Sequence, residues 1–117
     1  MRIFDARRIG LDQGSRVLFS DFQDGGEMWT GRGAREKRLW VKFSRSFHDA
    51  PSVFVGFSMW DLDAQTNPRA DITSENITAQ GFDLVFRTWS DTRVARIRAD
   101  WMAIGPVAFE DDWNVGS

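Results

Sequence analysis

Few residues in this sequence could do acid–base, nucleophilic or metal chemistry. The 117 residues include no cysteine and one histidine, His48, which excludes thiolate metal sites and histidine clusters. A nucleophile–base pair would have to use His48, which lies in RSFHDAPS shortly before Pro51. We interpret it as an exposed turn residue, and we predict that the chain is not an enzyme and carries no metal or cofactor.

Two further motifs have residues that bind ions in other contexts. DLDAQTN, with Asp61 and Asp63, resembles a calcium loop only loosely, because it lacks the glycine and the distal glutamate of an EF-hand. Its carboxylates, and that of Asp71, could equally hydrogen-bond their own backbone in turns. GRGARE (31–36) does not lead from a strand into a helix, so we interpret it as a mobile loop rather than a phosphate cradle.

With catalysis and ion binding set aside, the remaining possibility is that aromatic and planar polar side chains bind a ligand. An indole packs against the C–H face of a sugar ring, and an arginine can hydrogen-bond the sugar's hydroxyls. Trp89 and Arg69 supply this pair if the turns that carry them meet in space. Each has an alternative role. Trp89 could cap the edge of a sheet, and Arg69 could pair with Asp61 or Asp71, which composition favours.

The elements that must position these residues are strands, because apolar residues recur with a period of two. In FDLVFRTW, Phe82, Leu84 and Phe86 form one apolar face, and Trp89 follows on the opposite, mostly polar face. No window predicts an amphipathic helix, although ARRIG could form a short turn. The sequence predicts an all-β fold, a six-stranded antiparallel, immunoglobulin-like β-sandwich, with strands within 16–22, 35–43, 52–61, 69–76, 81–89 and 94–104.

Length predicts a single domain, for which we expect the bounds 15–106. An N-terminal segment (1–14) precedes it, and an acidic tail (107–117) follows that could dock through Trp113. The net charge of −2 argues against nucleic acid as a partner. We find no signal segment and no membrane span, which leaves the localisation open between the cytosol, release by an unusual route and display on a larger particle.

Aromatic residues are abundant, with ten phenylalanines, six tryptophans and no tyrosine. A core of this size seldom holds six tryptophans, so several must lie outside it. Trp29, Trp40, Trp60 and Trp113 could serve a subunit interface or a second site. Trp40 and Trp60 lie on otherwise polar strand faces, which favours the interface.

The run from Ser15 to Gly105 resembles the H-type lectin domain, the family of the snail agglutinins and of the C-terminal domain of the slime-mould discoidins. The most specific pieces are the turn Asn67-Pro68-Arg69, NIT..GF at 76–82, TWSDT at 88–92 and the closing Trp101. The resemblance implies a sandwich that assembles as a homotrimer. It also implies binding of glycans with terminal N-acetylgalactosamine or galactose, without a metal, at sites shared between protomers.

The resemblance also assigns site residues by position. Arg69 would hydrogen-bond the sugar from one protomer, and Trp89 would pack on it from the next. Ser90 stands where the snail protein has a contacting histidine. Ala95 stands where the family has a tyrosine that closes the site.

The family's site aspartate falls within GRGARE, where Gly33 or Arg32 aligns with it, and Glu36 could replace it only if the loop is rearranged. A lost carboxylate acceptor weakens binding of galactose-type hydroxyls. Two functions therefore stay open. The first is a multivalent lectin, and the alternative is a structural, receptor-binding or assembly module of a phage-like particle or adhesion component, with an altered sugar site.

Overall fold

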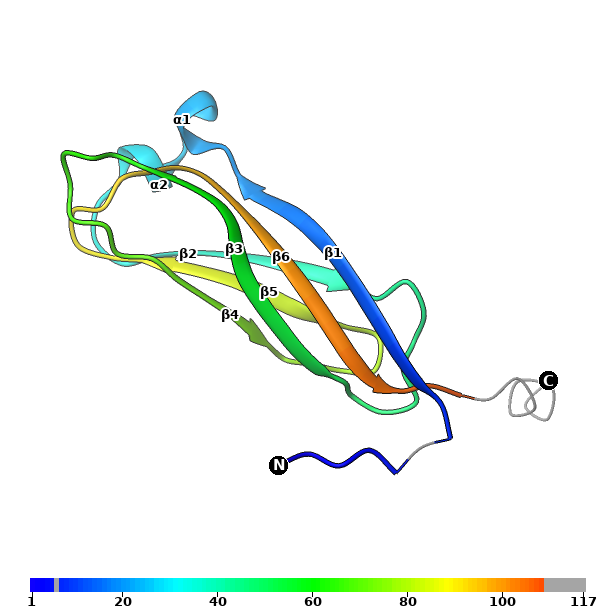
Figure 1. Ribbon diagram of the computed structural model, residues 1–117. Coiled ribbons are helices and arrows are strands. Elements are labelled where there is room, and N and C mark those ends of the chain that lie inside the picture. The colour runs from blue at the N-terminus through cyan, green and yellow to red at the C-terminus, as the bar shows by residue number, and fades with distance from the viewer. Residues whose placement is uncertain (6, 109–117) are drawn as a thin grey trace.

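The computed structural model describes residues 1–5 and 7–108. These residues form two packed three-stranded antiparallel sheets, with strand orders β1-β6-β3 and β2-β5-β4, which confirms the predicted β-sandwich (Figure 1). No helix among them is long and apolar enough to cross a membrane. The elements are β1 (Ile9–Phe19), α1 (Asp21–Asp24), α2 (Glu27–Thr30), β2 (Arg35–Lys42), β3 (Ser52–Leu62), β4 (Asp71–Glu75), β5 (Gly81–Thr88) and β6 (Val94–Pro106).

The central strand β5 follows the predicted alternation on its inner face. Phe82, Leu84 and Phe86 are fully buried between the sheets. Val85 is fully buried as well, so the outer face of this strand is less polar than predicted. Arg38 of β2 flanks Val85 in register, and long arginine stems commonly cover apolar neighbours in this way.

Aromatic rings fill the core at the end of the sandwich away from the helices. The ring of Phe82 lies 5.8 Å from that of Phe43 and 5.5 Å from that of Trp101, measured between centroids. Trp101, the tryptophan that closes the lectin-like sequence pattern, is 7% exposed and is therefore a core residue.

The first strand is where the prediction was wrong. β1 begins at Ile9, within the segment assigned to 1–14, and ends at Phe19, so Asp21 and Phe22 lie in α1 instead of the strand. Glycines break the apolar alternation in the first half of β1, which hid it from a pattern search. The helix turn forms because the carboxylate of Asp21 accepts the N–H of Met28 at 2.9 Å and ties α1 to α2.

Other boundaries shift by one or two residues. β4 begins at Asp71, which leaves Arg69 in the preceding loop. Ile9 and Gly10 of ARRIG are strand residues, and Ala6 lies outside the described residues. The part of the tail from 109 onward, with Trp113, also lies outside them.

Candidate functional site

Three loops meet at the end of the sandwich that also carries α1 and α2 (Figure 1). They connect α2 to β2 (31–34), β3 to β4 (63–70) and β5 to β6 (89–93). The first and third are joined by the N–H of Gly33, which donates to the carbonyl of Ser90 at 2.8 Å. Thr92 of the third loop is also hydrogen-bonded to Asn67 and Arg69 of the second, so the turns that carry Arg69 and Trp89 lie together. The sugar-binding interpretation requires this.

Two buried threonines join the second and third loops. The hydroxyl of Thr92 donates to the carbonyl of Asn67 and accepts the N–H of Arg69 at 3.2 Å. The hydroxyl of Thr88 donates to the carbonyl of Arg69. Both threonines are at most 1% exposed, so these hydrogen bonds are shielded from water and fix the backbone on either side of Arg69.

Arg35 anchors the same end from within, a role that the sequence search missed. The residue is only 7% exposed. The guanidinium donates to the carbonyls of Thr92 at 2.7 Å, Gly33 at 3.0 Å, Met28 at 3.1 Å and Glu27 at 3.3 Å. Burial lowers the pKa of Arg35 by desolvation, against an opposing contribution from Glu27. One cation thus holds α2 and two of the loops together.

The side chain of Trp89 is 45% exposed, which leaves an indole face open to a ligand or to another chain. Ser90 has φ +62°, a left-handed conformation that turns the chain sharply after Trp89. Arg69 is only partly exposed. Its proposed ion pair with Asp61 or Asp71 is absent, because no ion pair within residues 1–5 and 7–108 includes Arg69.

The loop after Trp89 also brings a carboxylate to this end. The Oδ atoms of Asp91 both lie 3.4 Å from the side-chain amide of Asn67, a distance that leaves the carboxylate free to accept stronger donors. Asp91 is part of the TWSDT motif, but no pattern in the sequence singled it out as a site residue.

Trp29 and Arg93 connect α2 to the same loop. The guanidinium of Arg93 lies 4.2 Å from the centre of the Trp29 ring, and its Nε donates to the Trp29 carbonyl at 2.9 Å. Arg93 also pairs with Asp63 at 3.4 Å. Asp63 accepts the N–H of Gln65 at 2.9 Å, which is the turn role expected as the alternative to calcium. In the described part of the chain, no group of three His, Cys, Asp or Glu residues could hold a metal ion.

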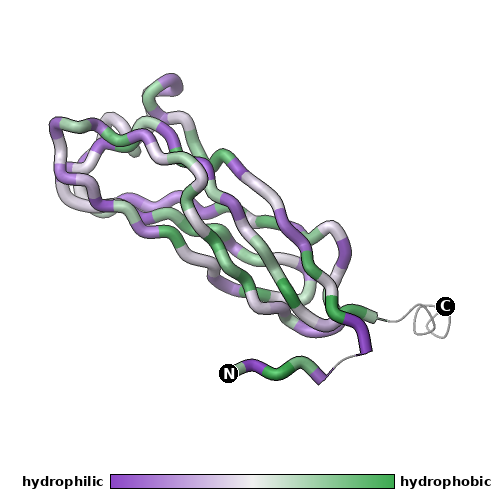
Figure 2. Tube along the Cα trace, in the orientation of Figure 1, coloured by the Kyte–Doolittle hydropathy of each residue, from purple (hydrophilic) through white to green (hydrophobic). Residues whose placement is uncertain are grey.

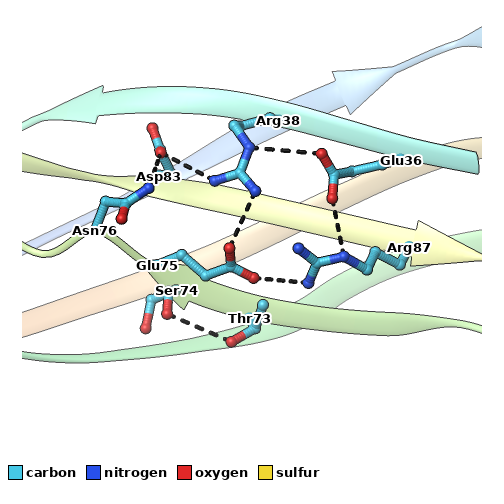
Figure 3. Close-up of polar contacts among 8 residues, drawn as sticks. All are labelled: Glu36, Arg38, Thr73, Ser74, Glu75, Asn76, Asp83 and Arg87. Atoms are coloured by element: carbon cyan, nitrogen blue, oxygen red, sulfur yellow. Dashed lines mark hydrogen bonds and ion pairs between the residues drawn. The ribbon is translucent and has the colours of Figure 1, made fainter.

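Glu36 lies apart from the loops, on the outer face of the β2-β5-β4 sheet (Figure 3). Its carboxylate pairs with Arg87 at 2.9 Å and with Arg38 at 3.5 Å. Arg38 also pairs with Glu75 and Asp83, each at 3.0 Å, and Arg87 pairs with Glu75 at 2.7 Å. Hydrogen bonds from Arg87 and then Arg38 lower the pKa of Glu75. Glu36 is thus committed to this network.

Ala95 follows the third loop, as the second residue of β6. It lies in β6 and is 6% exposed. Its side chain faces a cavity of about 90 Å³ shared with Ser20, Phe22, Gln23, Asp61 and Arg96. Of the predicted site residues, the structure brings together Gly33, Arg69, Trp89 and Ser90 in the three loops. Ala95 lies at the same end but is buried at the start of β6, and Glu36 lies on the outer face of the other sheet.

The remaining singled-out residues are exposed. His48 lies on the surface, as predicted. Trp40 is 48% and Trp60 64% exposed. Trp60 borders a cavity of about 460 Å³ whose other walls include Leu62, Pro68 and Ala70.

Comparison with known proteins agrees with this geometry. The H-type lectin domain family model matches residues 39–104. A protein of Fuscovulum blasticum, described as ATP synthase subunits region ORF 7, is 61% identical over 107 residues, which cover 92% of this chain and 93% of that protein. Discoidin-2 of Dictyostelium discoideum is 36% identical over 76 residues, which cover 64% of this chain and 30% of that protein.

Comparison with solved structures gives the same family resemblance. Recombinant discoidin II of Dictyostelium discoideum superposes with a TM-score of 0.75 at 26% identity, over 90% of this chain and 40% of that chain. The tailspike protein gp49 of Pseudomonas phage LKA1 shares only the fold, with a TM-score of 0.52 at 14% identity over 86% of this chain and 15% of that chain. The chain therefore spans well under half the length of the discoidins it matches.

Proposed function

Because this chain belongs to the H-type lectin domain family, we propose that it is a non-enzymatic, carbohydrate-binding protein that acts as a homotrimer. The proposed ligands are glycans with terminal N-acetylgalactosamine or galactose. Each site lies between two protomers, with Arg69 from one and Trp89 from the next. The observation that carries the proposal is the meeting of the Gly33, Arg69 and Trp89 loops at one end of the sandwich, with the Trp89 indole exposed.

The chemistry of these groups suits a sugar. The indole offers an apolar plane to the ring's C–H face, and the guanidinium donates to its hydroxyls. A galactose-type sugar also needs a carboxylate acceptor, and Glu36 is held by Arg87 and Arg38 on another face. We propose that Asp91, the carboxylate beside Ser90, supplies that acceptor.

A single open site of this kind binds weakly, with a Kd of about millimolar to micromolar. Three sites on one particle raise the apparent affinity through effective concentration. This accounts for how a small site without a metal could retain a glycan-coated surface.

The test is a glycan array with the wild-type protein beside Trp89→Ala, Arg69→Ala and Asp91→Asn. We expect each variant to lose most of the binding while keeping the melting temperature within a few degrees. Trp40→Ala is the matched control, because Trp40 is equally exposed at 48% but lies on a strand away from the loops. Absence of any bound glycan for a correctly assembled wild-type protein would remove the lectin function.

The second candidate is a structural or assembly module on the same fold. It is favoured by the loop 31–34, which contains no carboxylate, and by the commitment of Glu36 to its arginine partners. A protein partner that protects the amides of 88–92 from hydrogen exchange, together with a blank glycan array, would support it.

A further inference from the structure

A cavity opens on the side of the sandwich, between two edge strands. β3 and β4 are outer strands of their sheets, and the loop 63–70 connects them (Figure 1). Both strands include hydrophobic stretches (Figure 2). The cavity has a volume of about 460 Å³, which is within the range of small-molecule sites. We name it the side cavity, and its walls include Trp60, Leu62, Pro68 and Ala70.

Strand register directs Trp60 towards the side cavity. Trp60 of β3 lies opposite Ile97 of β6, which is fully buried between the sheets. Because opposite residues of an antiparallel pair point to the same face, Trp60 lies on the inner face of the sheet and not on the polar face that the sequence alternation indicated. The change of face comes from a bulge between Phe57 and Met59, which adds one residue, Ser58, to the strand.

The indole of Trp60 is open to solvent and yet held in place. The residue is 64% exposed. Its ring contacts that of Phe57 edge-on, with 5.9 Å between the centroids, and the Phe57 ring lies 6.1 Å from that of Phe86 in the core. This row of rings supports the indole from the core side, so a ligand that packs on its exposed side has little side-chain motion to order.

The backbone of β3 supplies polar groups beside the indole. Because β3 is an edge strand, every other N–H and C=O group points away from β6. The bulge after Phe57 and a second irregularity between Asp61 and Leu62 break the regular spacing of these groups, which hinders the addition of another strand. A ligand with a single N–H and a single C=O needs no regular spacing.

Two aspartates restrict the charge of a ligand. Asp61 and Asp63 both border the side cavity, and their carboxylates repel an anion. Asp63 pairs with Arg93 at 3.4 Å and accepts the N–H of Gln65 at 2.9 Å, which reduces the attraction for a cation. The side cavity therefore suits an uncharged ligand that combines an apolar face with an amide.

We propose that the side cavity binds an N-acetylhexosamine, an uncharged sugar with an acetamido group. The C–H face of its ring packs on Trp60. The acetamido methyl lies against the apolar walls at Leu62 and Pro68, and the amide hydrogen-bonds the open edge of β3. A plain hexose lacks both the methyl and the amide, and a peptide strand needs the regular edge that the bulges interrupt.

The side cavity adjoins the candidate site. Pro68 of its wall directly precedes Arg69, and consecutive Cα atoms are about 3.8 Å apart. A glycan whose terminal sugar contacts Arg69 can thus place its second sugar in the side cavity, and this step rests on the proposed function. Two joined contacts bind more tightly than either alone, through effective concentration. Trp60 then selects the second sugar of the glycan and leaves the choice of the first to Arg69 and Trp89.

The first test compares the dissociation constants of one sugar and of two, measured by calorimetry. The probes are the methyl glycoside of N-acetylgalactosamine and two disaccharides in which this sugar is linked to N-acetylglucosamine or to glucose. We expect wild type to bind the N-acetylglucosamine disaccharide about tenfold more tightly than the glucose disaccharide. Trp60→Ala should bind both disaccharides equally and keep the wild-type Kd for the single sugar.

Trp40→Ala is the control for this test, because Trp40 is also exposed but lies on β2 in the other sheet, and it should behave as wild type. Equal affinity of wild type for the two disaccharides would overturn the proposal. So would a preference that persists in Trp60→Ala.

The second test does not depend on the proposed function. Trp89→Ala removes the indole of the candidate site and leaves the side cavity intact. The probe is the methyl glycoside of N-acetylglucosamine, observed by saturation-transfer NMR. We expect its acetamido methyl to receive saturation from Trp89→Ala and not from the double variant Trp89→Ala, Trp60→Ala. Absence of transfer from Trp89→Ala, or equal transfer from both proteins, would overturn the proposal. If this transfer is present but wild type binds no N-acetylgalactosamine, the proposed function alone is wrong.

Other occupants of the side cavity give different results. An N-acetylated apolar tripeptide is the peptide probe, and saturation of the tripeptide but not of the sugar would assign the side cavity to a peptide partner. A Trp60→Ala protein with a smaller mass in solution than wild type, at unchanged circular dichroism, would assign Trp60 to a contact between copies. Either result would overturn the proposal.

Discussion

Arg35→Met tests whether one buried cation organises the candidate site. The substitution keeps the length of the side chain but removes all four hydrogen bonds to backbone carbonyls. Hydrogen bonds from a charged group contribute about 1.5 kcal/mol or more each, and longer ones less. The two bonds at 3.0 Å or below and the two longer ones give roughly 4 kcal/mol, from which better burial of an apolar side chain recovers about 1 kcal/mol.

We therefore expect Arg35→Met to lower the free energy of unfolding by about 3 kcal/mol. A 117-residue domain has an unfolding entropy of about 0.25 kcal/mol/K, so the melting temperature should fall by about 12 °C. The carbonyls of Gly33 and Thr92, in two of the site loops, lose their hydrogen bonds from the Arg35 guanidinium. Glycan binding should therefore also weaken in protein that is still folded. The assay pairs calorimetry with the glycan array at a temperature well below both transitions.

The control for this prediction is Arg38→Met, which removes an arginine of the exposed network on the β2-β5-β4 sheet. Exposed ion pairs contribute little, so this variant should melt close to wild type and bind glycans normally. An Arg35→Met protein that melts within about 3 °C of wild type would refute the anchoring role. So would one that melts early yet binds glycans at full strength.

Two further predictions concern pH and packing. The folded pKa of Glu75 is lowered from 4.5, so its stabilising contribution is present above about pH 4.5 and is lost as the pH falls through the folded pKa. The melting temperature of wild type should therefore fall with acidification in this range, and that of Glu75→Gln should fall less steeply. Equal slopes for the two proteins would contradict the assignment. Gly14→Ala should lower the free energy of unfolding by about 1–3 kcal/mol, because its Cβ would lie 2.8 Å from the Trp101 ring. Gly56→Ala is the control and should be tolerated, because its Cβ would lie 3.7 Å from Phe54. Chemical denaturation of both proteins measures the difference.

The parts of the fold that could be predicted are those in which burial alone sets the pattern. β5 lies between two strands and under the other sheet, so Phe82, Leu84 and Phe86 had to be apolar and the strand was found almost to the residue. β1 failed because its inward residues are glycines that make room for Trp101 and Val107, and its apolar residues point outward. A pattern search assumes that the apolar face is the buried one, and in β1 that assumption does not hold within one chain.

In the candidate site too, some residues could be predicted from the sequence and others could not. Trp89 was found because an aromatic residue on a polar face breaks an alternation, which is visible in the sequence. Arg35, Thr88 and Thr92 act through hydrogen bonds to backbone carbonyls in loops far away along the chain, up to 57 residues for Arg35 and Thr92, and no local pattern marks such a bond. Arginine at the first position of a strand looks like a solvated charge until its depth is known.

β1 and Trp89 raise the same physical question: why the folded chain exposes apolar side chains to water. Each exposed group costs free energy that folding of one chain does not recover. Leu11 and Phe54 lie at one end of the sandwich, and Trp89 lies at the other. The trimer of the proposed function would bring Trp89 beside a neighbour's Arg69, so assembly gives the exposed indole a partner that a single chain does not supply.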